Sequence, residues 1–197
     1  STRKVWAHPI RTKDRVFSIF SEWLAMVENQ TGRKLKCLRT DNGCEFKSEE
    51  FVKFCRERGI RHEYTTPYSP EQFVKFCRER GIRREYTTPY SPEQNGIAER
   101  MNRMIQERVV SMLQHSGLSD GFWVEALLTT VHIINMSPSR PLGLKIPQEI
   151  WTSSKPSYDK LRMFGCEAYA LIPKDDRRKL KPRSRKCVFL GYGPDSE

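Results

Sequence analysis

The feature that most limits how this chain can fold is a tandem repeat near its middle. Residues 51–72 are followed at once by residues 73–94, and the two copies differ at one position, His62 against Arg84. Repeat architectures drift in sequence and need about three units to bury a core. Two nearly identical copies indicate instead a recent tandem duplication, or an error in sequence assembly, within an otherwise single fold.

Each copy carries one predicted helix and one predicted strand. In the first copy the helix covers 48–59, with Ser48 as its N-cap and Gly59 as its C-cap, and the strand covers 60–64. The junction between the copies offers a further N-cap at Ser69. The insertion therefore adds whole elements, and it can fold locally.

The remaining sequence predicts an α/β core followed by a smaller β-rich part. Apolar spacing and capping residues predict strands over 3–10 and 34–38, a turn over 39–43, helices over 12–30, 96–115 and 120–135, and a helical turn over 146–151. The helix over 120–135 is apolar nearly all round, which favours burial. From about residue 161 the pattern changes to strands. We expect domains over 1–152 and 161–197, joined by a linker over 153–160.

The charge of the chain favours a polyanionic partner. The formal net charge is +11, and residues 174–186 hold eight basic and two acidic side chains. Nucleic acid is the simplest such partner, although a solvated loop that keeps the protein soluble would have the same composition. The six cysteines form no CxxC pair, which favours reduced thiols over a zinc site or a disulfide scaffold.

Two carboxylates are placed where metal ligands are often found. Asp41 follows a predicted strand, and Glu99 lies in the first turn of the helix over 96–115. Carboxylates suit hard divalent cations, and two such ions can hold both oxygens of an in-line phosphoryl transfer. Each residue also has a structural interpretation. Asp41 can simply form a tight turn, and Glu99 can pair at the surface with Arg103 at i+4.

Five stretches together resemble the integrase of copia-type LTR retrotransposons: LKCLRTDNGCEF, YSPEQNGIAERMNR, FWVEALLTTVHIINMSPS, KLRMFGCEAYALIP and RKLKPRSRKCVFLGY. The resemblance covers essentially the whole chain in order. It implies an RNase H-like core, here lacking its first two strands, followed by a truncated small SH3-like β-domain. It also implies DNA integration by strand transfer, at a site of two aspartates and one glutamate that binds Mg²⁺ or Mn²⁺.

The resemblance assigns roles to particular residues. Asp41 matches the second aspartate and Glu99 the glutamate, as catalytic residues and metal ligands, whereas nothing in the chain matches the first aspartate. In that family 35 residues typically separate the two matched positions; here 57 do, and subtracting one 22-residue copy restores 35. The residues expected to bind nucleic acid are Asn95, Arg100, Asn102, Arg103, Arg177, Arg178, Lys179, Lys181, Arg183, Arg185 and Lys186.

The resemblance therefore implies an integrase fragment, which we expect to be inactive as it stands. The expected partners are element and target DNA and further copies of the chain, with no membrane and no small-molecule substrate. The expected location is the nucleus and the cytoplasm, since no signal peptide or membrane span is evident. The alternatives are a non-catalytic nucleic-acid-binding remnant or domesticated module, and a relic without function.

Overall fold

The computed structural model describes residues 2–41, 43–64, 96–177 and 179–193, without the side chains of Gly96 and Ile97. The chain divides into two compact units, Ile10–Arg100 and Ser1–Pro9 with Met101–Glu197. No helix in these described ranges is long and apolar enough to cross a membrane.

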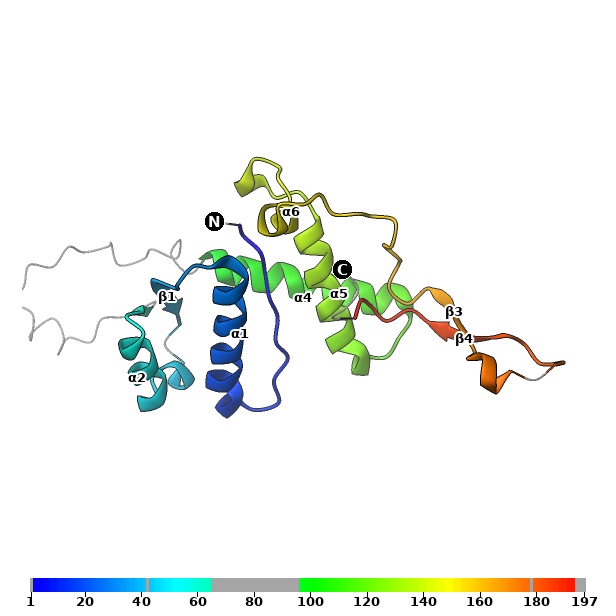
Figure 1. The fold of residues 1–197 in the computed structure, drawn as a ribbon, viewed down its shortest axis with the longest axis horizontal. Helices are drawn as coiled ribbons and strands as arrows, with labels where there is room; N and C mark the ends of the chain where they lie inside the picture. The colour runs from blue at the N-terminus through cyan, green and yellow to red at the C-terminus, as the bar shows by residue number, and fades with distance from the viewer. Residues whose placement is uncertain (1, 42, 65–95, 178, 194–197) are drawn as a thin grey trace, which may run out of the picture. The chain divides into compact units, whose positions relative to one another are not determined.

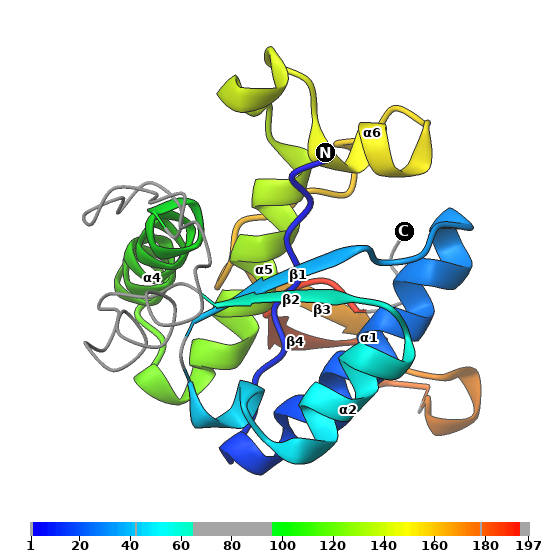
Figure 2. The same ribbon diagram turned by 90° about the vertical axis from the view of Figure 1, so that its left-hand side faces the viewer.

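The unit Ile10–Arg100 is built on one parallel pair of strands. Its elements are the 3-10 turn η1 (Lys13–Arg15), α1 (Val16–Thr31), β1 (Cys37–Thr40), the 3-10 turn η2 (Cys44–Phe46), α2 (Glu49–Glu57) and β2 (Arg61–Tyr64). Cys37 lies opposite Arg61 and Thr40 opposite Tyr64. α2 makes the crossover that parallel strands require. Figure 2 shows α1 and α2 on the same side of the pair.

The core of this unit joins both helices to the strands. Leu24 of α1 is packed with Phe51, Cys55 and Ile60, and Phe51 is fully buried. The N-cap predicted at Ser48 is confirmed, because its hydroxyl accepts a hydrogen bond of 3.3 Å from the Phe51 N–H. The helix and the strand in this core belong to the first copy of the repeat, and the second copy lies outside the described residues.

The other unit packs helices against each other and carries a β-hairpin. Its elements are α4 (Gly96–Ser116, which begins in the first unit), η3 (Asp120–Phe122), α5 (Trp123–Met136), η4 (Arg140–Leu142), α6 (Pro147–Thr152), β3 (Glu167–Leu171), η5 (Lys174–Asp176) and β4 (Ser184–Val188). Ile105 of α4 packs on Val131 and Ile134 of α5. Figure 1 shows the ribbons of these two helices. β3 and β4 pair antiparallel, with Leu171 opposite Ser184.

The prediction of a strand over 3–10 is wrong. The described part of this segment has no regular secondary structure. The Val5 N–H donates to Asn135 Oδ1 at 2.9 Å, and Asn135 Nδ2 donates to the Val5 carbonyl at 2.8 Å. A single side-chain amide on α5 thus satisfies both main-chain groups that a neighbouring strand would otherwise pair with.

Two further predictions need correction. The strand expected over 34–38 lies at Cys37–Thr40, because Leu35 donates its N–H to the Glu28 carboxylate instead of to a strand. The helix over 120–135 is not buried all round as its composition predicts. Trp123 and Leu128 on α5 are 48% and 43% exposed, so this helix is only partly buried. The other predicted helices are confirmed within a few residues.

Candidate active site and nucleic-acid interface

Asp41 lies directly after β1, at the carboxyl end of the parallel pair. Its side chain is exposed, and its Oδ1 accepts a hydrogen bond of 3.1 Å from the Gly43 N–H. This is the tight turn that the sequence offered as the structural interpretation. The turn and a role as a metal ligand are compatible, since the hydrogen bond fixes the direction of a carboxylate that stays at the surface.

The turn after Asp41 is anchored to the second strand. The Tyr64 hydroxyl donates to the Phe46 carbonyl at 3.2 Å, and the Lys47 ammonium lies 6.0 Å from the centre of the Tyr64 ring. The pKa of Tyr64 is raised, mainly by burial, so its hydroxyl stays protonated and can donate this hydrogen bond. β2 therefore holds the η2 turn and, through it, the position of Asp41.

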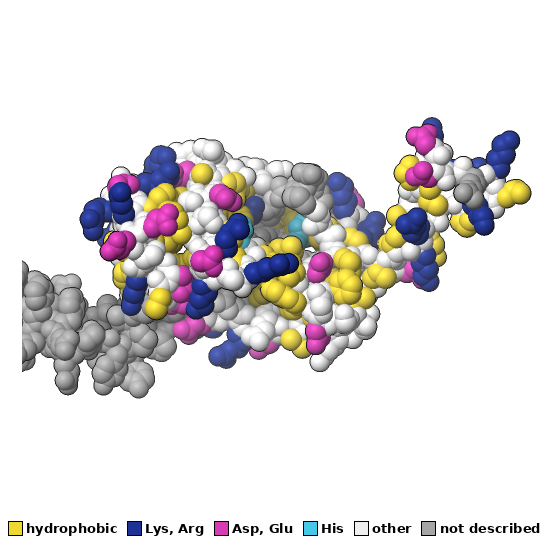
Figure 3. Space-filling model, turned by 90° about the horizontal axis from the view of Figure 1, so that it is seen from below, with side chains coloured by type: hydrophobic (Ala, Val, Ile, Leu, Met, Phe, Trp, Pro, Cys, Tyr) yellow, Lys and Arg dark blue, Asp and Glu magenta, His cyan; other side chains and the backbone are white. Residues whose placement is uncertain are grey.

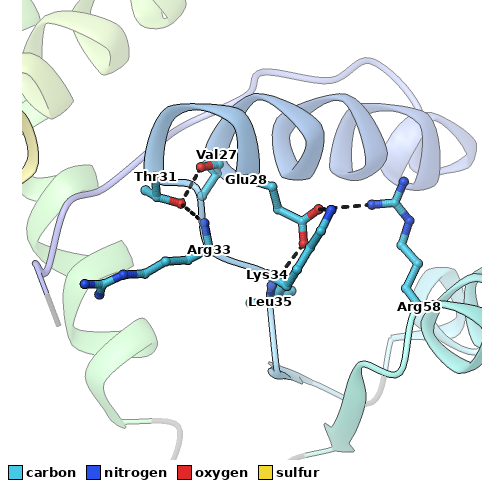
Figure 4. Close-up of polar contacts among 7 residues, drawn as sticks. All are labelled: Val27, Glu28, Thr31, Arg33, Lys34, Leu35 and Arg58. Carbon is cyan, nitrogen blue, oxygen red and sulfur yellow. Dashed lines mark hydrogen bonds and ion pairs between the residues drawn. The ribbon is translucent and has the colours of Figure 1, made fainter.

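Glu28 fixes the other end of β1. Its carboxylate, on α1, accepts hydrogen bonds from the Leu35 N–H at 3.0 Å, from Lys34 Nζ at 2.9 Å and from Arg58 Nη1 at 3.3 Å (Figure 4). These bonds, the one from Leu35 first, lower the pKa of Glu28. One carboxylate thus ties α1 to the chain entering β1 and to the residue after α2.

Glu99 lies in the first turn of α4, on the side away from the core. Glu99, Asn102 and Arg103 are exposed, whereas Met104 and Ile105 pack into the helical core. Arg100 is exposed as well. The predicted polar face of this helix is therefore confirmed as an accessible surface. Asn95, which precedes it, lies outside the described residues.

Asp41 and Glu99 belong to two described ranges of the chain that residues 65–95 separate. The connection from β2 to α4 runs through residues 65–95, which lie outside the described ranges. Within those ranges, no group of three or more His, Cys, Asp or Glu side chains is arranged to hold a metal ion. The residues described here therefore do not complete a divalent-metal site, and no catalytic step can be traced through a metal ion in them.

The basic block on the β-hairpin divides into two kinds of side chain. Arg177 Nε donates to the Ile172 carbonyl at 2.7 Å, and Lys186 pairs with Glu167 across the strands, so both help to hold the hairpin together. Lys186 is nevertheless exposed, and so are the other basic residues of the block that the structure describes: Lys174, Lys179, Lys181, Arg183 and Arg185. Figure 3 shows Lys and Arg side chains at the far end of the hairpin. Arg178 lies outside the described residues.

Comparison with known proteins decides the family. An integrase core domain model matches residues 1–70, and a retroviral polymerase SH3-like domain model matches residues 166–197. The Retrovirus-related Pol polyprotein from transposon TNT 1-94 of Nicotiana tabacum is 44% identical over 195 residues, 99% of this chain. The chain belongs to the copia-type retrotransposon integrases. The Pol polyprotein from transposon RE1 of Arabidopsis thaliana is 31% identical over 191 residues, 97% of this chain.

This integrase chain spans 13% of the length of the tobacco polyprotein and 11% of the RE1 polyprotein. It also matches an uncharacterized mitochondrial protein of Arabidopsis thaliana, AtMg00710, with 48% identity over 86 residues, 44% of this chain and 69% of that protein. Among solved structures, a chain of the simian T-cell lymphotropic virus intasome in complex with PP2A regulatory subunit B56 gamma has 18% identity and a TM-score of 0.48. The match covers 92% of this chain and 55% of that one.

Sequence reasoning missed Glu28 and Asn135 as the polar residues that position the integrase elements. Both are buried, at 8% exposure each, and both bond to main-chain groups outside their own helices. Glu28 follows Leu24 by one helical turn, on the apolar side of α1. A carboxylate at such a position was the signal that could have identified it, since buried charges are almost always paired.

Proposed function

We propose that this chain forms part of an integrase that joins element DNA to target DNA by metal-dependent strand transfer. Asp41 and Glu99 would supply two of the three carboxylates that bind Mg²⁺ or Mn²⁺. The observation that carries the proposal is the placement of both residues. Each is exposed at the end of a core element, one after β1 and one in the first turn of α4, while the opposite faces of those elements are packed.

The 197-residue chain does not catalyse strand transfer by itself. Only two of its carboxylates match the family triad, and the repeat lengthens the connection between them. A hard cation held by two protein carboxylates keeps most of its water and binds weakly. An oligonucleotide joining assay in Mg²⁺ or Mn²⁺ tests this. We expect no joined product. If the natural chain joined the oligonucleotides and Glu99→Gln abolished that joining, the expected inactivity would be contradicted.

DNA binding involves two surfaces in this proposal. Arg100, Asn102 and Arg103 on α4, with Asn95 before it, would meet the element end. The basic block of the hairpin would contact phosphates: Arg177, Arg178, Lys179, Lys181, Arg183, Arg185 and Lys186. Each phosphate contact releases counterions, so the affinity should fall steeply with salt. The working integrase would be a multimer of this chain on DNA.

The second candidate function is DNA binding without catalysis. It is favoured by one observation, the set of exposed basic side chains on the hairpin, among them Lys179, Lys181, Arg183 and Arg185, which need no metal ion and no carboxylate to contact DNA. Duplex binding measured with and without Mn²⁺ separates the two functions. In the binding-only function, Asp41→Asn and Glu99→Gln leave both the affinity and its response to Mn²⁺ unchanged. In the integrase function, both substitutions remove the response to Mn²⁺.

A further inference from the structure

The first copy of the repeat occupies the position beside β1. α2 and β2 supply Phe51, Cys55 and Ile60 to the core, where they pack with Leu24. The second copy offers the same three side chains as Phe73, Cys77 and Ile82. Apolar burial therefore gives no reason for the chain to choose one copy over the other.

Chain entropy gives no reason to choose the first copy either. With the first copy paired, the segment 41–60 connects β1 to β2, and the segment 65–95 connects β2 to α4. With the second copy paired, the corresponding connections would be 41–82 and 87–95. The extra copy lengthens one connection or the other in either arrangement. The entropy of loop closure therefore changes the ratio of the two arrangements by only about two-fold, and it favours pairing of the second copy.

The copies differ only where the first has His62. Its Nε2 lies 2.9 Å from the Thr40 hydroxyl, and its ring packs 4.2 Å from the Tyr64 ring centre and 5.5 Å from that of Phe51. Its Nδ1 is buried and has no hydrogen-bond partner in the described structure. Burial lowers the pKa of His62, so the ring is neutral at neutral pH.

An arginine fits this position poorly. Its guanidinium stays charged and carries five N–H donors. The nearby acceptor is the Thr40 hydroxyl, and the cation already beside Tyr64 is Lys47. Glu63 lies on the other face of the strand, where it bonds to Arg39 and Arg61. The arginine would therefore add a second positive charge beside the Tyr64 ring, where Lys47 already lies.

We propose that His62 selects the first copy of the repeat for pairing with β1, and that arginine at the matching position disfavours the second. The choice decides which of the two long connections carries the extra copy. It thereby sets which strand and loop lie next to Asp41. The selecting element is a single half-buried ring in a chain whose two copies are otherwise the same.

Thiol labelling of the full chain tests the proposal. Under native conditions iodoacetamide should modify Cys55, which is 2% exposed, at least roughly ten-fold more slowly than Cys77, because a buried thiol reacts only when the structure opens. Chymotryptic peptides 55–64 and 77–86 report the two thiols separately, since one contains histidine and the other arginine. The exposed Cys44 is the internal reference.

The decisive variant exchanges the two residues, His62→Arg with Arg84→His. The proposal predicts that the protected thiol changes from Cys55 to Cys77. Equal labelling of both thiols in the natural chain would overturn it, and so would continued protection of Cys55 in the exchanged chain.

A second pair of variants keeps the test decisive if the exchanged chain does not fold. Deleting 73–94 or deleting 51–72 leaves chains that differ only in histidine or arginine at position 62. Ser48 stands three residues before the helix phenylalanine in both. The folding constant from urea unfolding should be roughly ten-fold larger for the histidine chain, as expected for an unpaired, partly buried charge. Equal folding constants would refute the role of His62.

Discussion

Replacing Phe51 by alanine should strongly destabilise the unit Ile10–Arg100. Phe51 is 0% exposed and stands at the centre of an aromatic group. Its ring centre lies 5.1 Å from that of Phe20, 5.5 Å from Phe46 and 5.8 Å from Phe17. These partners come from α1 and from the turn after β1, so one side chain links three parts of the unit.

The expected loss is a large share of the stability of a small unit. Truncating a buried phenylalanine to alanine costs about 3–5 kcal/mol, through lost burial and the cavity that remains. The surrounding rings come from separate elements, so they cannot collapse easily into that cavity, and we expect about 4 kcal/mol. Whole domains are stable by about 5–15 kcal/mol. The ratio of folded to unfolded molecules should therefore fall by about three orders of magnitude.

Urea unfolding measured by circular dichroism gives the free energy. Amide hydrogen exchange of Arg61, whose N–H donates to the Lys36 carbonyl at 2.9 Å, reports the opening of this unit in particular. Phe73→Ala is the matched control, because Phe51 already fills the position in the core, and it should cost less than about 1 kcal/mol. A loss at Phe73 as large as that at Phe51 would refute the assignment of the first copy to the core.

Three other changes have defined outcomes. Asn135→Ala should destabilise the segment around Val5 by about 1–3 kcal/mol, because two part-buried main-chain groups lose their partner, and faster exchange of the Val5 amide would show it. Burial lowers the pKa of His62 below its ordinary value of 6.5, so the contribution of the neutral ring to stability is complete above pH 6.5 and is lost as the pH falls below that value. In His62→Gln the urea midpoint should therefore change less between pH 7 and pH 5 than in the natural chain. Glu28→Gln should lower the urea midpoint at neutral pH but much less at acidic pH, since the pKa of this carboxyl is lowered only in the folded chain.

The sequence predicted the elements whose signals are local. Helical spacing of apolar residues identified α4 and its exposed face, and Ser48 marked the start of α2. The strand over 3–10 was mispredicted, because alternation and a closing proline say nothing about the partner. That partner is Asn135, about 130 positions away in the chain. A side chain that satisfies a distant main chain leaves no periodic trace in the sequence.

The candidate site could be predicted only in part, because some of its features leave local signals in the sequence and others depend on the fold. Asp41 and Glu99 could be found because the resemblance fixes their positions and because each follows a recognisable boundary of an element. The sequence could not show which copy of the repeat packs beside β1, since the copies share every apolar residue. The contacts of His62 with Thr40, Phe51 and Tyr64 distinguish them, and these exist only in the folded unit.

The role of the two carboxylates can be tested most directly through DNA affinity. Binding of the natural chain to a blunt DNA duplex should be measured with and without Mn²⁺, beside Asp41→Asn and Glu99→Gln. If both residues bind metal at a DNA end, Mn²⁺ tightens binding by the natural chain and has much less effect on either variant. An equal effect of Mn²⁺ on all three proteins would contradict the assignment of Asp41 and Glu99 as metal ligands.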